Sequence, residues 1–298
     1  MAINDISLTS GMRNNLLSLQ NTTTLINRTQ TRLSTGKSVN TALDNPTNFF
    51  AAQTATARAT DLSNRKDGMS EAVQMVSAAN SGITGITSLI ESAQGVASAA
   101  LATTSATDRN NYAATFNTLM TQITQLASDS GYRGTNFLNS QNQTVEFAPA
   151  TGGATLQIKG FDGTATGLGL STASANLGGT AVAGQLDWTD STSVTMSDGT
   201  TTTQGTIDIQ SSASQLEGAL NTLRTQSSTL SANLSVVTTR QTFTDNMVTT
   251  LQTGADNLTL ADTNEEGANL LMLQTRQSLG ITSLSLASQA AQAVLKLF

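Results

Sequence analysis

The stretch LEGALNTLRTQSSTLSANLSVVTTRQTFTDNMVTTL, from Leu216 to Leu251, decides the fold. Its apolar residues recur at alternating steps of four and three, which is the spacing of a helix side that packs against another helix. No proline interrupts the pattern. A helix over these residues would be about 50 Å long at 1.5 Å per residue, which is more than a compact domain needs. The stretch therefore predicts a long helix in a rod-shaped molecule.

Three more segments carry the same spacing, and they predict further helices. They run from Met12 to Leu33, from Met69 to Leu101 and from Tyr112 to Leu126. Because helical segments occupy both ends of the chain, we expect a mainly α fold with a β-rich central insertion. The helices should form a long antiparallel coiled coil or helical bundle in which the N- and C-terminal helices pair.

The β-rich insertion is expected between residues 140 and 210, where the helical spacing stops. Glycine, threonine and serine are frequent there, and the turn signals are FDGT (Phe161–Thr164) and SDGT (Ser197–Thr200). Three pieces alternate as strands do: TLQIKG (Thr155–Gly160), TSVTM (Thr192–Met196) and GTIDIQ (Gly205–Gln210).

The composition limits the classes of partner. Only 11 % of the 298 residues are charged, against about 25 % in a typical soluble domain, so little keeps copies of the chain apart. The formal net charge of −6, with no long basic run, argues against nucleic acid as a partner. The first residues lack the basic and apolar regions of a Sec signal peptide.

The motifs that resemble catalytic or binding sites are incomplete. STGKS (Ser34–Ser38) ends like a phosphate-binding loop, but Thr31 stands where that loop needs glycine, so we expect a turn that ends a helix. DTNEEG (Asp262–Gly267) starts like a calcium loop, but Leu273 replaces its final carboxylate, so we expect the entry to a helix. The chain has no His and no Cys, which excludes Ser–His–Asp and Cys–His chemistry. We expect no enzyme, no cofactor and no metal.

The tail QSLGITSLSLASQAAQAVLKLF, Gln277–Phe298, has no charge before Lys296. Its apolar residues form two stripes, and Leu284 and Leu286 represent them about 200° apart around a helix. We expect one stripe to pack on the N-terminal helix and the other on neighbouring copies, because the tail is too polar for a membrane. The predicted polymerisation residues are Met12, Leu16, Leu19, Ile26, Leu33, Leu270, Leu273, Leu279, Leu284, Leu286, Val294, Leu297 and Phe298.

Three segments resemble bacterial flagellins. RTQTRLSTGKSVNTALDNPTNFFAAQ (Arg28–Gln53) is similar to the family's N-terminal signature, and SDSGYRGTNFL (Ser128–Leu138) to the turn that closes its N-terminal helical region. LADTNEEGANLLMLQTRQSLGITSLSLASQAAQAVLKLF (Leu260–Phe298) resembles the family's closing segment. The resemblance covers roughly the first 140 and last 90 residues.

The resemblance implies a structural subunit that polymerises into the flagellar filament used for swimming. It also implies filament cap, hook-associated junction and export chaperone partners, and export through the flagellar type III channel to the cell exterior. A hook–filament junction protein and a coiled-coil scaffold protein are the alternatives. The implied division is an inner core of residues 1–44 and 255–298, an outer core of 45–139 and 211–254, and a solvent-facing β-rich region of 140–210.

Overall fold

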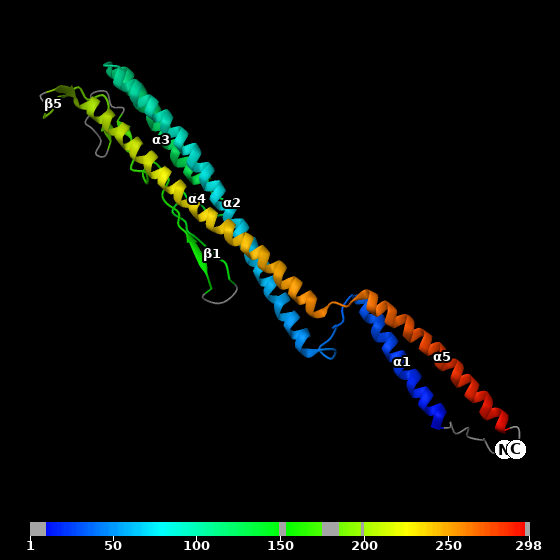
Figure 1. The fold of residues 1–298 in the computed structure, drawn as a ribbon. Helices are drawn as coiled ribbons and strands as arrows, with labels where there is room; N and C mark the ends of the chain where they lie inside the picture. Colours follow the sequence, from blue (N-terminus) through cyan, green and yellow to red (C-terminus); the bar gives the residue numbers. More distant parts are fainter. Residues whose placement is uncertain (1–9, 149–152, 175–184, 198–199, 296–298) are drawn as a thin grey trace, which may run out of the picture. The chain divides into compact units, whose positions relative to one another are not determined.

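The computed structural model describes residues 10–148, 153–174, 185–197 and 200–295. Within these ranges the chain is mainly α-helical (Figure 1), and every segment with the four-and-three spacing lies in a helix. The mainly α fold class is therefore confirmed. The helices are α1 (Ser10–Thr35), α2 (Pro46–Ala102), α3 (Ala106–Asp129), α4 (Gln204–Thr259) and α5 (Thr263–Leu295).

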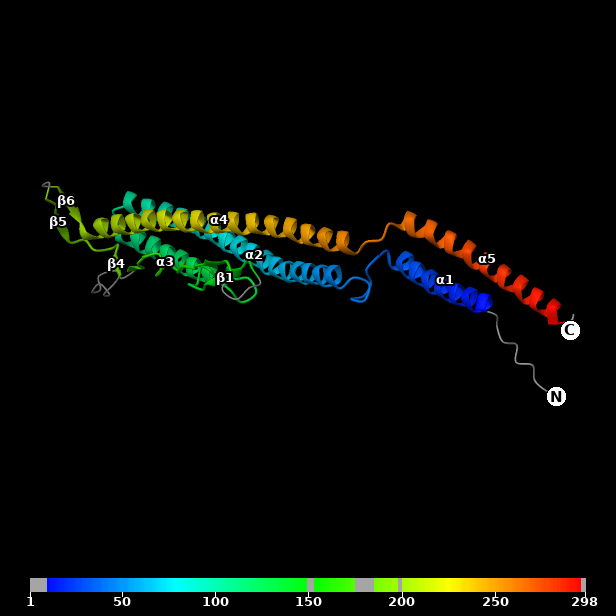
Figure 2. The ribbon, with the colours of Figure 1, turned by 60° about the horizontal axis from the view of Figure 1, so that its bottom comes forward.

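The chain divides into two compact units. Unit 1 comprises residues 1–60 and 247–298, and unit 2 comprises residues 61–246. In unit 1, α1 and α5 lie side by side in both Figure 1 and Figure 2, so the predicted pairing of N- and C-terminal helices is confirmed. The five-part division stays a prediction. The division between the two units falls inside α2, after residue 60, and inside α4, after residue 246.

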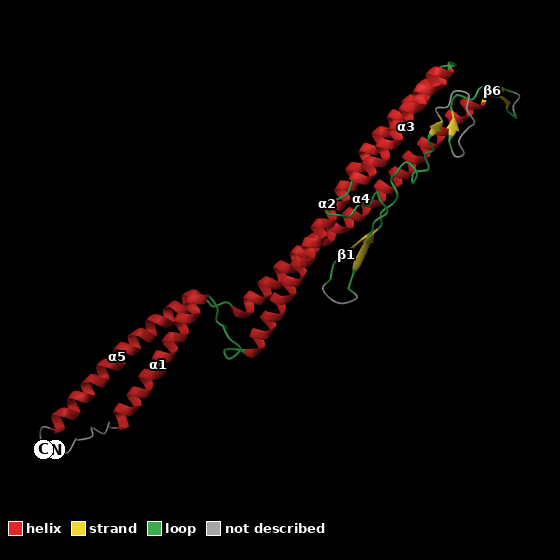
Figure 3. Ribbon diagram, turned by 180° about the vertical axis from the view of Figure 1, so that it is seen from behind, coloured by secondary structure: helices red, strands yellow, loops and turns green. Residues whose placement is uncertain are grey.

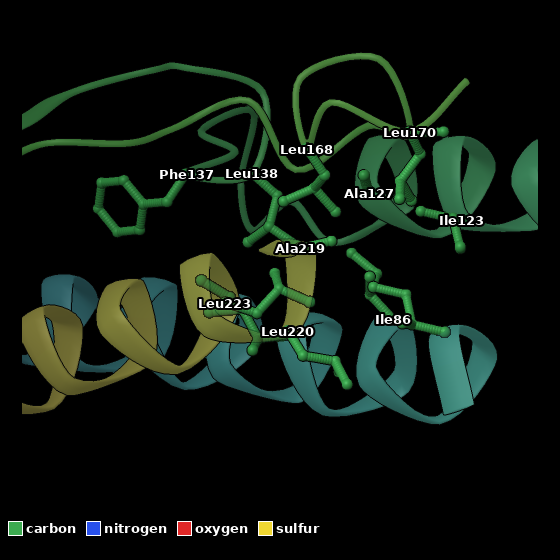
Figure 4. Packing of buried hydrophobic residues seen from close by; sticks show 14 of the residues in the cluster. Ile86, Ile123, Ala127, Phe137, Leu138, Leu168, Leu170, Ala219, Leu220 and Leu223 are labelled. Carbon is green, nitrogen blue, oxygen red and sulfur yellow. The ribbon is translucent and has the colours of Figure 1, made fainter. Parts of the chain in front are cut away.

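Unit 2 has a continuous hydrophobic core between α2, α3 and α4. In Figure 4, Ile86 of α2, Ile123 of α3 and Leu223 of α4 point into one shared interior. A side chain added at Gly85 would lie 2.7 Å from Leu126, so this glycine allows α2 and α3 to approach closely. The largest fully buried side chains of the three helices are Met69, Ile86, Ile90, Phe116, Ile123, Ile209, Leu216 and Leu223.

The strands of the central region are short, and among the described residues they form two-stranded pairs (Figure 3). Strands β1 (Gln143–Glu146) and β2 (Thr155–Ile158) are antiparallel, as are β5 (Ser193–Thr195) and β6 (Thr201–Thr203), while β3 (Ala173–Ser174) and β4 (Leu186–Asp187) are parallel. The strands predicted in TLQIKG and TSVTM are therefore confirmed. The FDGT turn is also found, because the Asp162 carboxylate accepts the Thr164 N–H at 3.0 Å. Residues 198–199 of SDGT lie outside the described ranges.

The strand predicted in GTIDIQ is wrong, because Gly205–Gln210 forms the first turns of α4. Ile209, Ser212 and Leu216 are all fully buried, and their steps of three and four are those of a helix. Arg109 of α3 also donates to the Thr206 hydroxyl at 3.1 Å. Tertiary contacts thus override the alternation of apolar and polar residues.

Two amide side chains hold residues 171–173, at the start of β3, against the helices. Asn117 of α3 donates to the Ala173 carbonyl at 2.7 Å and accepts the Ala173 N–H at 2.8 Å. Gln215 of α4 accepts the Ser171 N–H at 2.9 Å. These side chains replace a neighbouring strand, which explains how so short a strand pair stays ordered. Beside it, Trp188 packs on Phe116 with ring centroids 4.9 Å apart.

The turn that follows α3 carries the SDSGYRGTNFL segment. Its Asn136 side chain is buried and donates to the last carbonyls of α3, at Ala127 (2.8 Å) and Ser128 (2.9 Å). Gly134 has a φ of +87°, which favours glycine over any residue with a side chain. The segment therefore closes α3 by satisfying carbonyls that a helix end leaves unpaired.

Replacing Asn117 with Ala should lower the free energy of unfolding of the protein by about 1–3 kcal/mol, because the Ala173 N–H and carbonyl lose their partners. Urea titration followed by the fluorescence of Trp188, which is the single tryptophan, measures this change. Asn111→Ala, at an exposed position of the same helix, is the control and should stay within about 0.5 kcal/mol. Equal losses for both variants would contradict the role of the Asn117 amide.

Candidate assembly surface on the terminal helices

The inner side of the α1–α5 pair is a narrow apolar seam. Met12 and Ile26 of α1 and Leu273 of α5 are buried in it. Leu19 and Leu284 are half-buried. A side chain at Gly280 would lie 2.6 Å from Leu19, so glycine at this position lets the two helices approach.

A charged pair fixes the register of α1 on α5. The Arg32 guanidinium donates to the Glu266 carboxylate at 3.0 Å, and the Glu266 side chain is 10 % exposed. Arg32 lies in the last turn of α1 and Glu266 in the first turn of α5. Each charge is therefore opposite in sign to the partial charge of its own helix end, which is favourable. The pair stabilises one alignment of a seam that is otherwise made of small and aliphatic residues.

The two connections that leave the helix pair are joined by backbone hydrogen bonds. The Ser38 N–H donates to the Thr259 carbonyl at 2.7 Å, and the Ala261 N–H donates to the Gly36 carbonyl at 3.0 Å. Gly36 has a φ of +67° directly after α1, so STGKS is a turn that ends a helix, as expected. DTNEEG is a helix entry, also as expected, since the Asp262 carboxylate accepts the Asn264 N–H at 2.8 Å.

The outer side of the pair exposes aliphatic side chains to solvent. Leu286 is 69 % exposed and Leu279 is 66 % exposed. Both lie in the uncharged stretch Gln277–Leu295. We use the name aliphatic face for the exposed aliphatic side chains of the two helices. Leu16 and Leu33, each 38 % exposed, border the seam, and the other members are Leu17, Leu25, Leu271, Met272, Leu279, Ile281 and Leu286.

Threonine hydroxyls on these helices are already hydrogen-bonded inside their own helix. Thr23 and Thr24 of α1 donate to the carbonyls four residues earlier at 3.0 and 3.1 Å, and Thr282 of α5 does so at 2.9 Å. A hydroxyl that donates to a carbonyl of its own helix needs no acceptor from a second molecule. The outer side can therefore be covered by another apolar surface at a low polar cost.

The structure separates the predicted polymerisation residues into two groups. Met12, Leu19, Ile26, Leu270, Leu273 and Leu284 lie toward the seam as buried or half-buried side chains. Leu16, Leu33, Leu279 and Leu286 are exposed. Nothing is described of the Val294 side chain, and Leu297 and Phe298 lie outside the described residues. A role in polymerisation stays a prediction for all of them.

The predicted polymerisation residues lack five exposed members of the aliphatic face: Leu17, Leu25, Leu271, Met272 and Ile281. The four-and-three spacing used to find the helices selects only one residue of an adjacent apolar pair. It selects Leu16, for example, and leaves out Leu17. An adjacent apolar residue is the signal that finds all of them except Ile281, because neighbours lie about 100° apart and one seam cannot bury both.

Other kinds of site are not found among the residues that the structure describes. They contain no group of three acidic side chains that could hold a metal ion. None of the helices in these ranges is long and apolar enough to cross a membrane.

Comparisons with known proteins agree with this geometry. Residues 3–143 match the family model of the bacterial flagellin N-terminal helical region. Over the full length of both proteins the chain is 29 % identical to flagellin FljO and 28 % identical to flagellin FljM of Caulobacter vibrioides. Flagellin C of Rhizobium meliloti is 35 % identical over 85 residues, which are 28 % of this chain and 26 % of that protein.

A mainly α chain with paired terminal helices and these relatives is a filament-forming structural subunit. The chain belongs to the bacterial flagellin family, so the resemblance of the three sequence segments is confirmed. Flagellins polymerise with copies of themselves into the extracellular flagellar filament, which serves motility.

Replacing Glu266 with Ala should destabilise the filament by about 3 kcal/mol per subunit, because Arg32 is left partly buried without its carboxylate. The temperature at which filaments depolymerise should fall accordingly. Glu265→Ala, at the exposed neighbouring position, is the control and should behave like the unchanged protein. The exchange Arg32→Glu with Glu266→Arg should recover only part of the loss, since each charge then has the same sign as the partial charge of its helix end. Identical melting of the Glu265 and Glu266 variants would contradict the register role.

Proposed function

We propose that this chain builds the flagellar filament by burying the aliphatic face of α1 and α5 against neighbouring copies. The observation that carries the proposal is that well-exposed aliphatic side chains such as Leu279 and Leu286 lie on a helix without charge from Gln277 to Leu295. Burying one such leucine contributes about 1.5–3 kcal/mol, and the aliphatic face offers several. The predicted polymerisation residues divide accordingly: seam residues pair α1 with α5, and exposed ones contact other subunits.

The finer division of the chain belongs to the same proposal. Residues 1–44 and 255–298 form the inner core, 45–139 and 211–254 form the outer core, and 140–210 face solvent. In support, α1 and α5 share unit 1, while the long core of α2, α3 and α4 lies in unit 2.

The partners beyond the chain itself are a filament cap, hook-associated junction proteins and an export chaperone. The subunit leaves the cell through the flagellar type III channel and acts as a structural protein without catalysis. Membership of the flagellin family supports these assignments. For the lack of catalysis, a further support is that the whole sequence has no His and no Cys, which excludes Ser–His–Asp and Cys–His chemistry.

Replacing Leu286 with Asp tests the aliphatic face without touching the seam, because Leu286 is exposed in the single chain. A carboxylate that becomes buried without a partner costs several kcal/mol. The concentration needed for seeded filament growth should therefore rise by at least about 100-fold, which corresponds to about 2.7 kcal/mol. Sedimentation of polymer after seeding gives this concentration.

Leu286→Met is the matched control, since it keeps an apolar side chain of similar volume. It should grow filaments at nearly the original concentration. Circular dichroism of the unpolymerised Asp variant should match that of the unchanged protein, which separates a lost contact from a lost fold. Normal growth of the Asp variant would overturn the proposal.

A further inference from the structure

The loop between α1 and α2 is held in one conformation by Asp44. The Asp44 carboxylate accepts the N–H groups of Asn40 at 3.1 Å and Thr41 at 3.0 Å, and the Thr41 hydroxyl at 3.1 Å. Hydrogen bonds from Thr41 are the main reason that the pKa of Asp44 lies below its ordinary value. A further hydrogen bond joins the Asp44 N–H to the Thr41 carbonyl at 3.1 Å. The loop is therefore a fixed turn rather than a loose connection.

This fixed turn carries Leu43, which is 96 % exposed. Single exposed leucines are common on protein surfaces, so exposure alone does not make Leu43 a contact. Here the hydrogen bonds on both sides of Leu43 keep it projecting. Asn45 follows and caps α2 by accepting the Asn48 N–H at 3.1 Å, so the chain is also fixed after the loop.

The turn is continuous with the aliphatic face of α1. The Arg28 guanidinium lies 3.7 Å from the Asp44 carboxylate. On α1, Arg28 lies three residues after the exposed Leu25, about 60° from it around the helix. Leu43 therefore extends the surface that the proposed function assigns to contacts between subunits.

Unit 1 also contains a cavity of about 490 Å³, which we call the linker pocket. Its volume lies within the roughly 300–1,000 Å³ of pockets that enclose a ligand-sized group. Leu43 is not among its lining residues. Ala57 lines it and is exposed, so the pocket is accessible from solvent. Its lining is mixed. The apolar residues are Val39, Phe49, Ala52, Ala57 and Ala255, and the polar residues are Lys37, Asn40, Gln53, Thr56, Thr60, Asp256 and Thr259.

Leu43 does not line the linker pocket, although residues earlier in the same loop do, so the projecting side chain of one copy can enter the partly apolar pocket of another. Such a contact is heterologous: each copy gives Leu43 to one neighbour and receives Leu43 from another. Repetition of a heterologous contact that does not close on itself produces an open helical array. A flagellin filament is built by self-polymerisation, so a second copy of this chain is the occupant that fits.

We propose that Leu43 of one subunit inserts into the linker pocket of the next subunit in the filament. The contact rests on the proposed function, since it forms only between assembled copies of this chain. It adds a directional contact outside the helix seam, between a connection of one subunit and the start of α2 in another.

Cysteine cross-linking tests the contact, because the chain has no cysteine of its own. The double variant Leu43→Cys with Ala57→Cys is seeded into filaments and treated with a short bismaleimide. Denaturing gels should show a ladder of dimers, trimers and longer products, since every copy carries both partners of a heterologous contact. A mixture of the two single variants should give dimers and no ladder.

Leu43→Cys with Ala51→Cys is the matched control. Ala51 is exposed on α2 like Ala57, but it does not line the pocket and its side chain points about 120° away from that of Ala57 around the helix. The control should form filaments with less than about a tenth of the cross-linked product. Unpolymerised double variant should give monomers alone.

The outcomes separate the two proposals. Filaments that form without a ladder, or with an equal ladder in the Ala51 control, overturn the Leu43 contact and leave the proposed function intact. A ladder that also forms in unpolymerised protein, or dimers alone from the double variant, overturns the directional contact as well. Failure of the unchanged chain to polymerise from seeds would overturn both.

Discussion

A pair of helices has no interior: each helix buries one stripe against the other, and its remaining surface faces outward. This constraint governs α1 and α5. Their seam takes up Met12, Ile26 and Leu273, while leucines such as Leu279 and Leu286 remain in solvent. Burial of apolar surface is the dominant favourable term in folding, so a pair with this much left exposed is only marginally stable by itself. In the proposed filament, contact with further copies supplies the missing burial.

Unit 2 meets the same constraint within one chain. There α3 and the turn around Leu138 pack on the apolar surface that α2 and α4 leave uncovered as a pair. Large side chains from all three helices are fully buried. Small residues at the helix contacts, including Gly85, allow the close packing that this core needs. One chain thus combines a self-sufficient bundle with a terminal helix pair whose outer face stays available.

The helices could be predicted from the sequence because the spacing of Leu216, Leu220 and Leu223 is a local property of the chain. GTIDIQ could not be assigned correctly in the same way, since its alternation matches a strand and the deciding contacts, such as Arg109 on Thr206, come from distant residues. The seam and the aliphatic face were anticipated from the opposite positions of Leu284 and Leu286. The linker pocket and Leu43 lie on irregular connections without any periodicity, so only the three-dimensional arrangement shows them.

The most direct test of the central claim is hydrogen exchange measured by mass spectrometry on free and polymerised protein. Amides of residues 277–295 should exchange rapidly in the free chain and become at least about 100-fold slower in the filament, as expected for a segment of low local stability that gains its burial from other copies. Amides of residues 216–230, within the core of unit 2, should be protected in both states. Strong protection of residues 277–295 in the free chain, or fast exchange of these residues in the filament, would contradict the account.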